Sequence, residues 1–77
     1  MTAEERLAKI RGALEDEMVY IYDECTTKFT DDEERSMLKP VFKSTFMKWA
    51  ICLDSENVID MYELECWKRR VERVESL

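Results

Sequence analysis

The sequence contains no histidine, one glycine and one proline. Without histidine, a nucleophilic side chain lacks its usual activating base, and zinc lacks one of its usual ligands. A single glycine leaves no glycine-rich loop for nucleotide phosphates and too few turn residues for a sheet joined by tight hairpins. These absences predict an all-α protein that is not an enzyme and binds no cofactor.

Cysteine is also sparse, and its spacing argues against two common uses. Cys25, Cys52 and Cys66 are an odd number without a CxxC pair, which suits neither a disulfide framework nor a zinc site. The opening segment carries acids where a signal peptide has a basic and then an apolar run. No uncharged stretch approaches the ~20 apolar residues of a membrane span. We therefore expect a cytoplasmic protein with reduced thiols and no membrane association.

What the chain does have is a balance of apolar and charged residues. Apolar residues make up 45% and charged residues 39% of the 77 positions, enough for one small core. We expect a single helical domain over residues 1–77. The net charge of −6 disfavours general affinity for nucleic acids and anionic membranes. It is compatible with a basic protein partner, but equally with simple solubility.

The first segment with helical periodicity follows Thr2. Apolar residues recur there at intervals of three and four, which predicts a helix over residues 3–27. Thr2 and Glu5 have the spacing of a capping box, in which each satisfies a backbone amide near the other.

A second periodic segment predicts a helix over residues 31–53, with Thr30 and Glu33 as its capping box. Pro40 lies inside this segment and removes one backbone donor. Either one kinked helix spans the segment, or two shorter helices meet at the proline. We favour the kink because the apolar stripe keeps its phase across Pro40.

A third helix is predicted to start at Asp54 or Ser55, as its N-cap, and to end at about residue 75. A helix with two apolar faces is either central in its domain or shared with a second chain. The two faces here are Val58, Ile59, Tyr62 and Cys66 on one side, and Leu64, Trp67, Val71 and Val74 on the other. We predict a compact three-helix bundle whose middle helix is kinked at Pro40.

The middle segment carries a second stripe opposite its predicted core face. The residues of this stripe recur at intervals of four, three and four, and they are Pro40, Ser44, Met47 and Ile51. Exposed apolar residues at helical spacing form a candidate interface, unless a neighbouring helix covers them. Together with the second apolar face of the last helix, this stripe predicts a homodimer. The predicted interface residues are Pro40, Ser44, Met47, Ile51, Trp67 and Val71.

Three arginines, Arg69, Arg70 and Arg73, lie along one side of the last predicted helix. Basic residues in a final turn offset the negative end of the helix dipole. The alternative is a charged docking site for nucleic acid or for an acidic protein surface. Acidic residues are interleaved and no aromatic residue faces outward among the arginines, so nucleic acid is the weaker of these two partners.

Residues 52–63 resemble the calcium-binding loop of EF-hand proteins. The resemblance implies a calcium site, but Cys52 replaces the first carboxylate and Asn57 replaces the glycine of the sharp turn. A thiol is a poor ligand for a hard cation, so we expect no metal. The positions that match the third, fifth, eighth, ninth and twelfth of the loop are Asp54, Glu56, Ile59, Asp60 and Glu63.

Two segments, EERLAKI near the start and DSENVIDM from Asp54, resemble parts of acyl carrier proteins. That resemblance implies a prosthetic group attached to Ser55. Glu56, however, stands where the family has an apolar residue after its attachment serine. The family also has two further helices after that helix, and only 22 residues follow Ser55.

From these patterns we expect a non-catalytic protein that acts by binding another protein, as a regulator, adaptor or inhibitor. Small acidic helical proteins of this kind include inhibitors encoded by phages, although this is analogy alone. The alternative is a nucleic-acid-associated regulator that uses the arginines of the last helix. A degenerate EF-hand-like or acyl-carrier-like protein is a minor alternative.

Overall fold

The computed structural model describes residues 1–28, 31–58 and 60–77. These residues form three α-helices and one π-helical turn without any strand, which confirms the predicted all-α class. No helix within the described ranges is long and apolar enough to cross a membrane. The elements are α1 (Ala3–Asp23), η1 (Glu24–Lys28), α2 (Asp32–Glu56) and α3 (Met61–Ser76).

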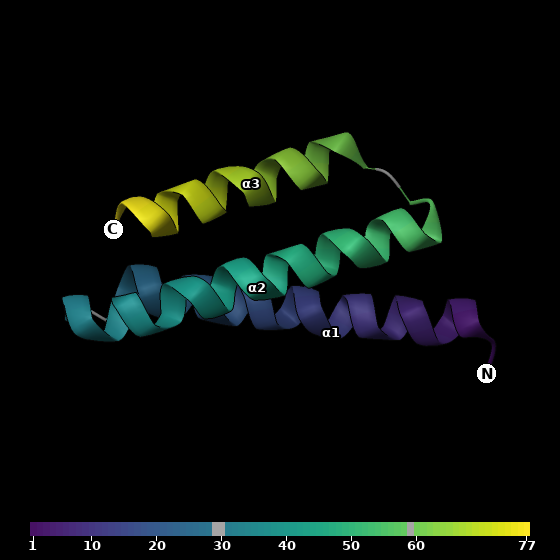
Figure 1. Cartoon of the computed structure of the whole chain (residues 1–77), viewed down its shortest axis with the longest axis horizontal. Helices are drawn as coiled ribbons and strands as arrows, with labels where there is room; N and C mark the ends of the chain where they lie inside the picture. Colours follow the sequence, from purple (N-terminus) through teal and green to yellow (C-terminus); the bar gives the residue numbers. More distant parts are fainter. Residues whose placement is uncertain (29–30, 59) are drawn as a thin grey trace.

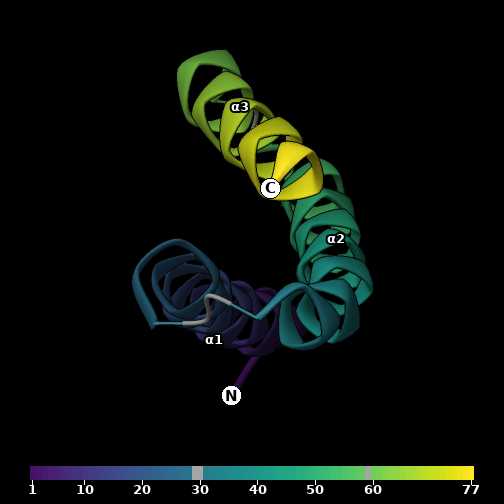
Figure 2. The same ribbon diagram turned by 90° about the vertical axis from the view of Figure 1, so that its left-hand side faces the viewer.

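Consecutive helices run in opposite directions, and α2 lies between α1 and α3 (Figure 1). Both outer helices pack against α2. Viewed along their length, the three helices form an open arc with α2 in its middle (Figure 2). The outer face of α2 and the space between α1 and α3 therefore lie on opposite sides of the molecule.

The core is built around a chain of aromatic rings. Tyr22, Phe42, Trp67, Trp49 and Phe46 follow one another with ring centroids 5.9–6.3 Å apart. Tilted and edge-on ring pairs at this spacing stabilise the fold beyond simple apolar burial. The other buried residues of the core cluster are Met18, Ile21, Cys25, Leu53, Val71 and Val74.

The N-terminal caps of α1 and α2 are short polar side chains. The hydroxyl of Thr2 accepts a hydrogen bond from the amide of Glu5 at 3.1 Å, so the predicted cap of the first helix is confirmed. α2 begins after Asp31, whose carboxylate accepts from the amide of Glu33 at 2.9 Å. Thr30, the predicted cap of this helix, lies outside the described residues.

The first helix ends in a widened turn, η1, close to the predicted end at residue 27. The hydroxyl of Thr26 donates to the carbonyl of Tyr22 at 2.8 Å, and that of Thr27 donates to the carbonyl of Asp23. Hydroxyls that bond carbonyls one turn back compete with the backbone ladder. The two threonines thus bond carbonyls of the last α-helical turn at the point where the helix widens.

The boundary between α2 and α3 differs from the prediction. α2 passes through Pro40 as one helix, continues to Glu56 and ends at Asn57, whose φ is 57°. The amide of Asn57 donates to the carbonyl of Asp54 at 3.1 Å. The amide of residue 58 donates to the carbonyl of residue 53 at 3.0 Å. These two bonds form a Schellman motif, which closes a helix at a residue in the left-handed conformation.

The N-cap of α3 is Asp60. Its carboxylate accepts hydrogen bonds from the amides of Tyr62 and Glu63 at 3.1 and 3.3 Å. The prediction that Asp54 or Ser55 caps the last helix is therefore wrong, because both residues lie in the last turn of α2.

This boundary also bears on the two family resemblances. Asp54 and Glu56 are helical and so do not belong to a calcium loop, and Ser55 lies at the end of a helix rather than at its start. Ile59 lies outside the described residues. Across the described ranges, no group of three or more His, Cys, Asp or Glu side chains is placed to hold a metal ion.

Candidate protein-binding surfaces

The face of α2 opposite its core residues carries five exposed residues. Two of them, Pro40 and Ser44, border a hollow that α1 also lines with Leu14 and Glu17. Met37, Met47 and Ile51 have exposed fractions of 70%, 55% and 64%. Pro40 and Ser44, which complete the series, are also exposed. The spacing of three, four, three and four is that of a coiled-coil seam, in which two helices pack along one stripe. We call these five residues the outer stripe.

Two of the predicted interface residues do not belong to this surface. Trp67 is 4% exposed and Val71 is 9% exposed, because both face α2 in the core. Their prediction as surface contacts is therefore wrong. Of the opposite predicted face, Tyr62 is exposed and Val58 precedes α3 rather than lying in it. Helix α3 has one core face, and the mistaken helix start created the apparent second one.

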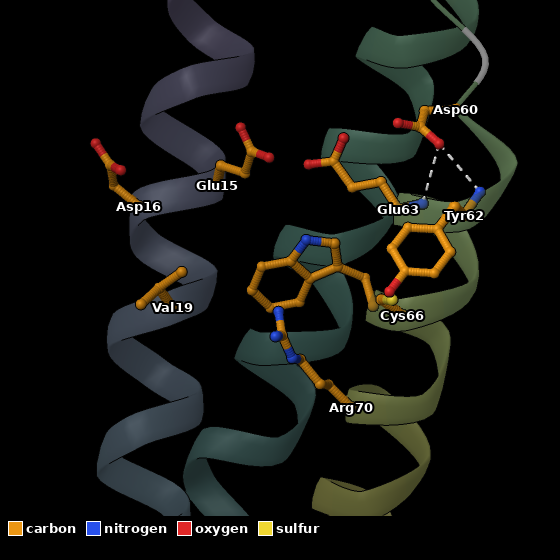
Figure 3. Close-up of a pocket in the computed structure, with 9 residues that line it drawn as sticks. Glu15, Asp16, Val19, Asp60, Tyr62, Glu63, Cys66 and Arg70 are labelled. Carbon is orange, nitrogen blue, oxygen red and sulfur yellow. Dashed lines mark hydrogen bonds between the residues drawn. The ribbon is translucent and has the colours of Figure 1, made fainter.

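A groove of about 520 Å³ separates α1 from α3 (Figure 3). Its walls combine carboxylates with aliphatic and aromatic side chains, and none of the lining residues comes from α2. We call it the α1–α3 groove. Its lining residues are Glu15, Asp16, Val19, Asp60, Tyr62, Glu63, Cys66, Trp67 and Arg70.

Glu15 and Glu63 extend toward each other from opposite walls of the groove (Figure 3). The pKa of Glu15 is raised to about 7. The larger cause is a hydrogen bond between the two carboxyl groups, and the smaller cause is burial of the Glu15 side chain. Arg11 opposes this shift, but its shortest bond goes elsewhere. Its Nε lies 2.7 Å from Glu56, whereas its Nη1 lies 3.9 Å from Glu15. The Glu15 carboxyl group therefore keeps its proton up to about neutral pH.

The three arginines of α3 have different environments. Arg70 places its guanidinium 4.5 Å from the ring centroid of Trp67 and 5.7 Å from that of Tyr22, which is cation–π geometry. Arg69 and Arg73 are exposed. Arg70 is exposed as well, and what distinguishes it from the other two is its contact with the two rings.

Sequence reasoning missed the α1–α3 groove. Glu15 and Glu63 are far apart in the chain, and each lies in an ordinary amphipathic helix. A signal for the correct helix start was present, because Asp60 and Glu63 have the spacing of a capping box. That signal would have placed Glu63 in the first turn of α3, but not opposite Glu15.

The three cysteines are unpaired, and two of them, Cys25 and Cys52, are buried. Burial raises the pKa of the Cys25 thiol, which keeps it protonated and unreactive.

Comparisons with models of protein families, with curated proteins and with solved structures found no match to this chain. Inference about its role therefore rests on the outer stripe and the α1–α3 groove.

Proposed function

We propose that this chain is a non-catalytic protein that acts by binding other proteins, and that the outer stripe joins two copies of it. The observation that carries the proposal is that all five residues of the outer stripe are exposed. They occupy five successive stripe positions of α2 with the spacing of a coiled-coil interface. Fully burying a large apolar side chain contributes roughly 1.5–3 kcal/mol. Two copies that appose the same stripe bury it on both sides at once.

An antiparallel pair of α2 helices fits the order of residues in the stripe. If the two-fold axis passes through Ser44, Met37 lies opposite Ile51 of the second copy, and Pro40 lies opposite Met47 of the second copy. Large residues thus meet large ones at the ends, and a small side chain at the axis lets the helices approach. The paired segment, residues 37–51, is short beside a standard interface, so we expect dissociation in about the micromolar range.

The like charge nearest the axis is offset within each copy. Lys43 would approach its own equivalent near the axis, but its Nζ lies 3.4 Å from the carboxylate of Glu75. Val41, which flanks the stripe, is 45% exposed and widens the apolar surface. A like-charge contact is therefore partly neutralised within each copy.

We also propose that Pro40 bends α2, because its ring clashes with the carbonyl of Ser36 and leaves that carbonyl without its helical donor. The bend would curve the stripe around the second copy, with the three helices packed as one bundle around α2. We place the chain in the cytoplasm, where three unpaired thiols remain reduced.

Mass measurements across the micromolar range test the dimer. The wild-type chain should change from monomer to dimer, and the double variant Met47→Glu with Ile51→Glu should remain a monomer with unchanged helicity. Ile10→Glu is the matched control, because Ile10 is 53% exposed but lies on α1. A monomer mass at every wild-type concentration, or equal loss of dimer in the control, would contradict the proposal.

The position of the axis has its own test. In a chain with Cys66→Ser, the variant Ser44→Cys should form a covalent dimer on mild oxidation, because a disulfide requires Cα atoms within about 7 Å. Glu65→Cys, on the exposed side of α3, is the control and should not cross-link. A dimer that forms normally but does not cross-link at position 44 would show a different pairing.

A second candidate, a nucleic-acid-associated regulator, is supported by the exposed side chains of Arg69 and Arg73, one turn apart on α3. Phosphate contacts give binding that falls steeply with salt. A salt-titrated binding assay with mixed DNA and RNA tests it. Binding that disappears in the variant Arg69→Gln with Arg73→Gln would favour this candidate over a purely protein-binding role.

A further inference from the structure

We propose that the α1–α3 groove is a docking site for a basic segment of a partner protein, whose lysine or arginine side chain enters between Glu15 and Glu63. The site shares no residue with the outer stripe, since no α2 residue lines it. Both surfaces can therefore be occupied at the same time.

Charge complementarity determines the class of partner. Four carboxylates line the groove, from Glu15 and Asp16 on one wall and from Asp60 and Glu63 on the other. Within the described residues, Glu63 forms no ion pair, and Glu15 has only the 3.9 Å contact with Arg11. A guanidinium or ammonium group between the facing carboxylates would supply the missing counter-charge. An acidic peptide or a nucleic acid would be repelled.

The remaining walls suit the rest of a basic side chain. Val19 and Tyr62, which are both exposed, provide aliphatic and aromatic surface for a long methylene stem. Arg70 already stacks on the ring of Trp67 at 4.5 Å, so the surface open to a partner is that of the two exposed side chains. The volume of about 520 Å³ lies within the usual range for ligand sites and exceeds what one side chain fills. A segment with apolar residues beside its basic ones would fill the groove best.

Binding should release a proton. The groups that face the carboxyl pair are Arg11 and Asp16 on α1, Glu56 on α2, and Asp60 and Arg70 with α3. With Glu15 titrating at about 7, the empty groove holds a proton below that pH, and an entering cation must displace it. Affinity should therefore rise as pH increases toward 7 and become constant above it, changing by up to about tenfold per pH unit below.

A synthetic amphipathic peptide, in which lysine and arginine alternate with leucine and alanine, is a suitable probe for calorimetry. The same peptide with glutamate in place of its basic residues is the matched control. The basic peptide should bind one per chain, more weakly at high salt, and should release protons, as measured in buffers of different ionisation enthalpy. No binding of the basic peptide, or equal binding of the acidic one, would overturn the proposal.

Variants locate the site. Glu15→Gln and Glu63→Gln should each lower the affinity for the basic peptide by about tenfold. Glu15→Gln should also abolish the dependence of that affinity on pH. Glu17→Gln on α1 and Glu72→Gln on α3 change net charge equally at exposed positions outside the groove, and should leave affinity nearly unchanged. Equal losses in all four variants would show attraction to overall charge instead of docking in the groove.

Discussion

The outer stripe and the α1–α3 groove are both open surfaces of one small helical protein, yet they arise differently. The stripe lies on a single helix, is mostly apolar, and follows from the spacing of residues along the chain. The groove is assembled from two helices that do not adjoin in sequence, and it combines facing carboxyl groups with aromatic rings. Periodicity suffices to find a surface of the first kind. A surface of the second kind exists only once the helices are placed in space.

The largest expected difference between the two surfaces is in stability. Trp67→Ala should lower the free energy of unfolding by about 3–5 kcal/mol, because the ring is buried between Phe42 and Trp49. Met47→Ala, on the outer stripe, should change it by less than about 0.5 kcal/mol in the monomer. Urea denaturation at concentrations too low for dimerisation measures both. Similar losses would mean that Met47 is covered or that Trp67 is not part of the core.

The second largest expected difference between the groove and the outer stripe is in how stability depends on pH. The folded state raises the pKa of Glu15 from 4.5 to about 7, so it binds more protons than the unfolded chain between these values. Stability should therefore fall by about 1–3 kcal/mol as pH rises from near 4.5 to near 7. Glu15→Gln should flatten this decline, whereas Glu17→Gln should preserve it. A decline that persists in Glu15→Gln would assign the effect to other carboxyl groups.

The corrected start of α3, which sets one wall of the groove, predicts a smaller effect. Asp60→Ala should cost about 1 kcal/mol of stability, since it leaves the amides of Tyr62 and Glu63 without their acceptor. Ser55→Ala, at the residue first expected to cap this helix, should be nearly neutral. Thermal melts of the two variants decide between the two helix starts, and the reverse order of effects would restore the original boundary.

The smallest expected effect separates one arginine from two others. Arg70→Gln should cost about 0.5–1 kcal/mol, because it removes the cation–π contact with Trp67 at 4.5 Å. Arg69→Gln and Arg73→Gln should leave the melting temperature nearly unchanged, because these exposed side chains lack the ring contacts that Arg70 makes. If all three variants melt alike, the contact of Arg70 contributes nothing measurable.

The sequence by itself determined the helical class, the Thr2 cap and the outer stripe, because each depends on residues close together in the chain. It could not decide where α2 ends. Asp54 and Ser55 are good caps by type, but Asn57 in the left-handed conformation closes a Schellman motif one turn later, and Asp60 then starts α3.

The boundary between α2 and α3 affects which residues of α3 enter the core and which face α1. With α3 starting at Met61, its single apolar face turns Trp67 and Val71 toward α2, so the core takes residues that the sequence pattern also allowed at a surface. The pairing of Glu15 with Glu63 follows from the same placement of α3 opposite α1. Local hydrogen bonds and apolar periodicity act over one or two turns and so can be inferred from sequence. The burial of a ring and the raised pKa of Glu15 beside Glu63 depend on distances that only the packed structure sets.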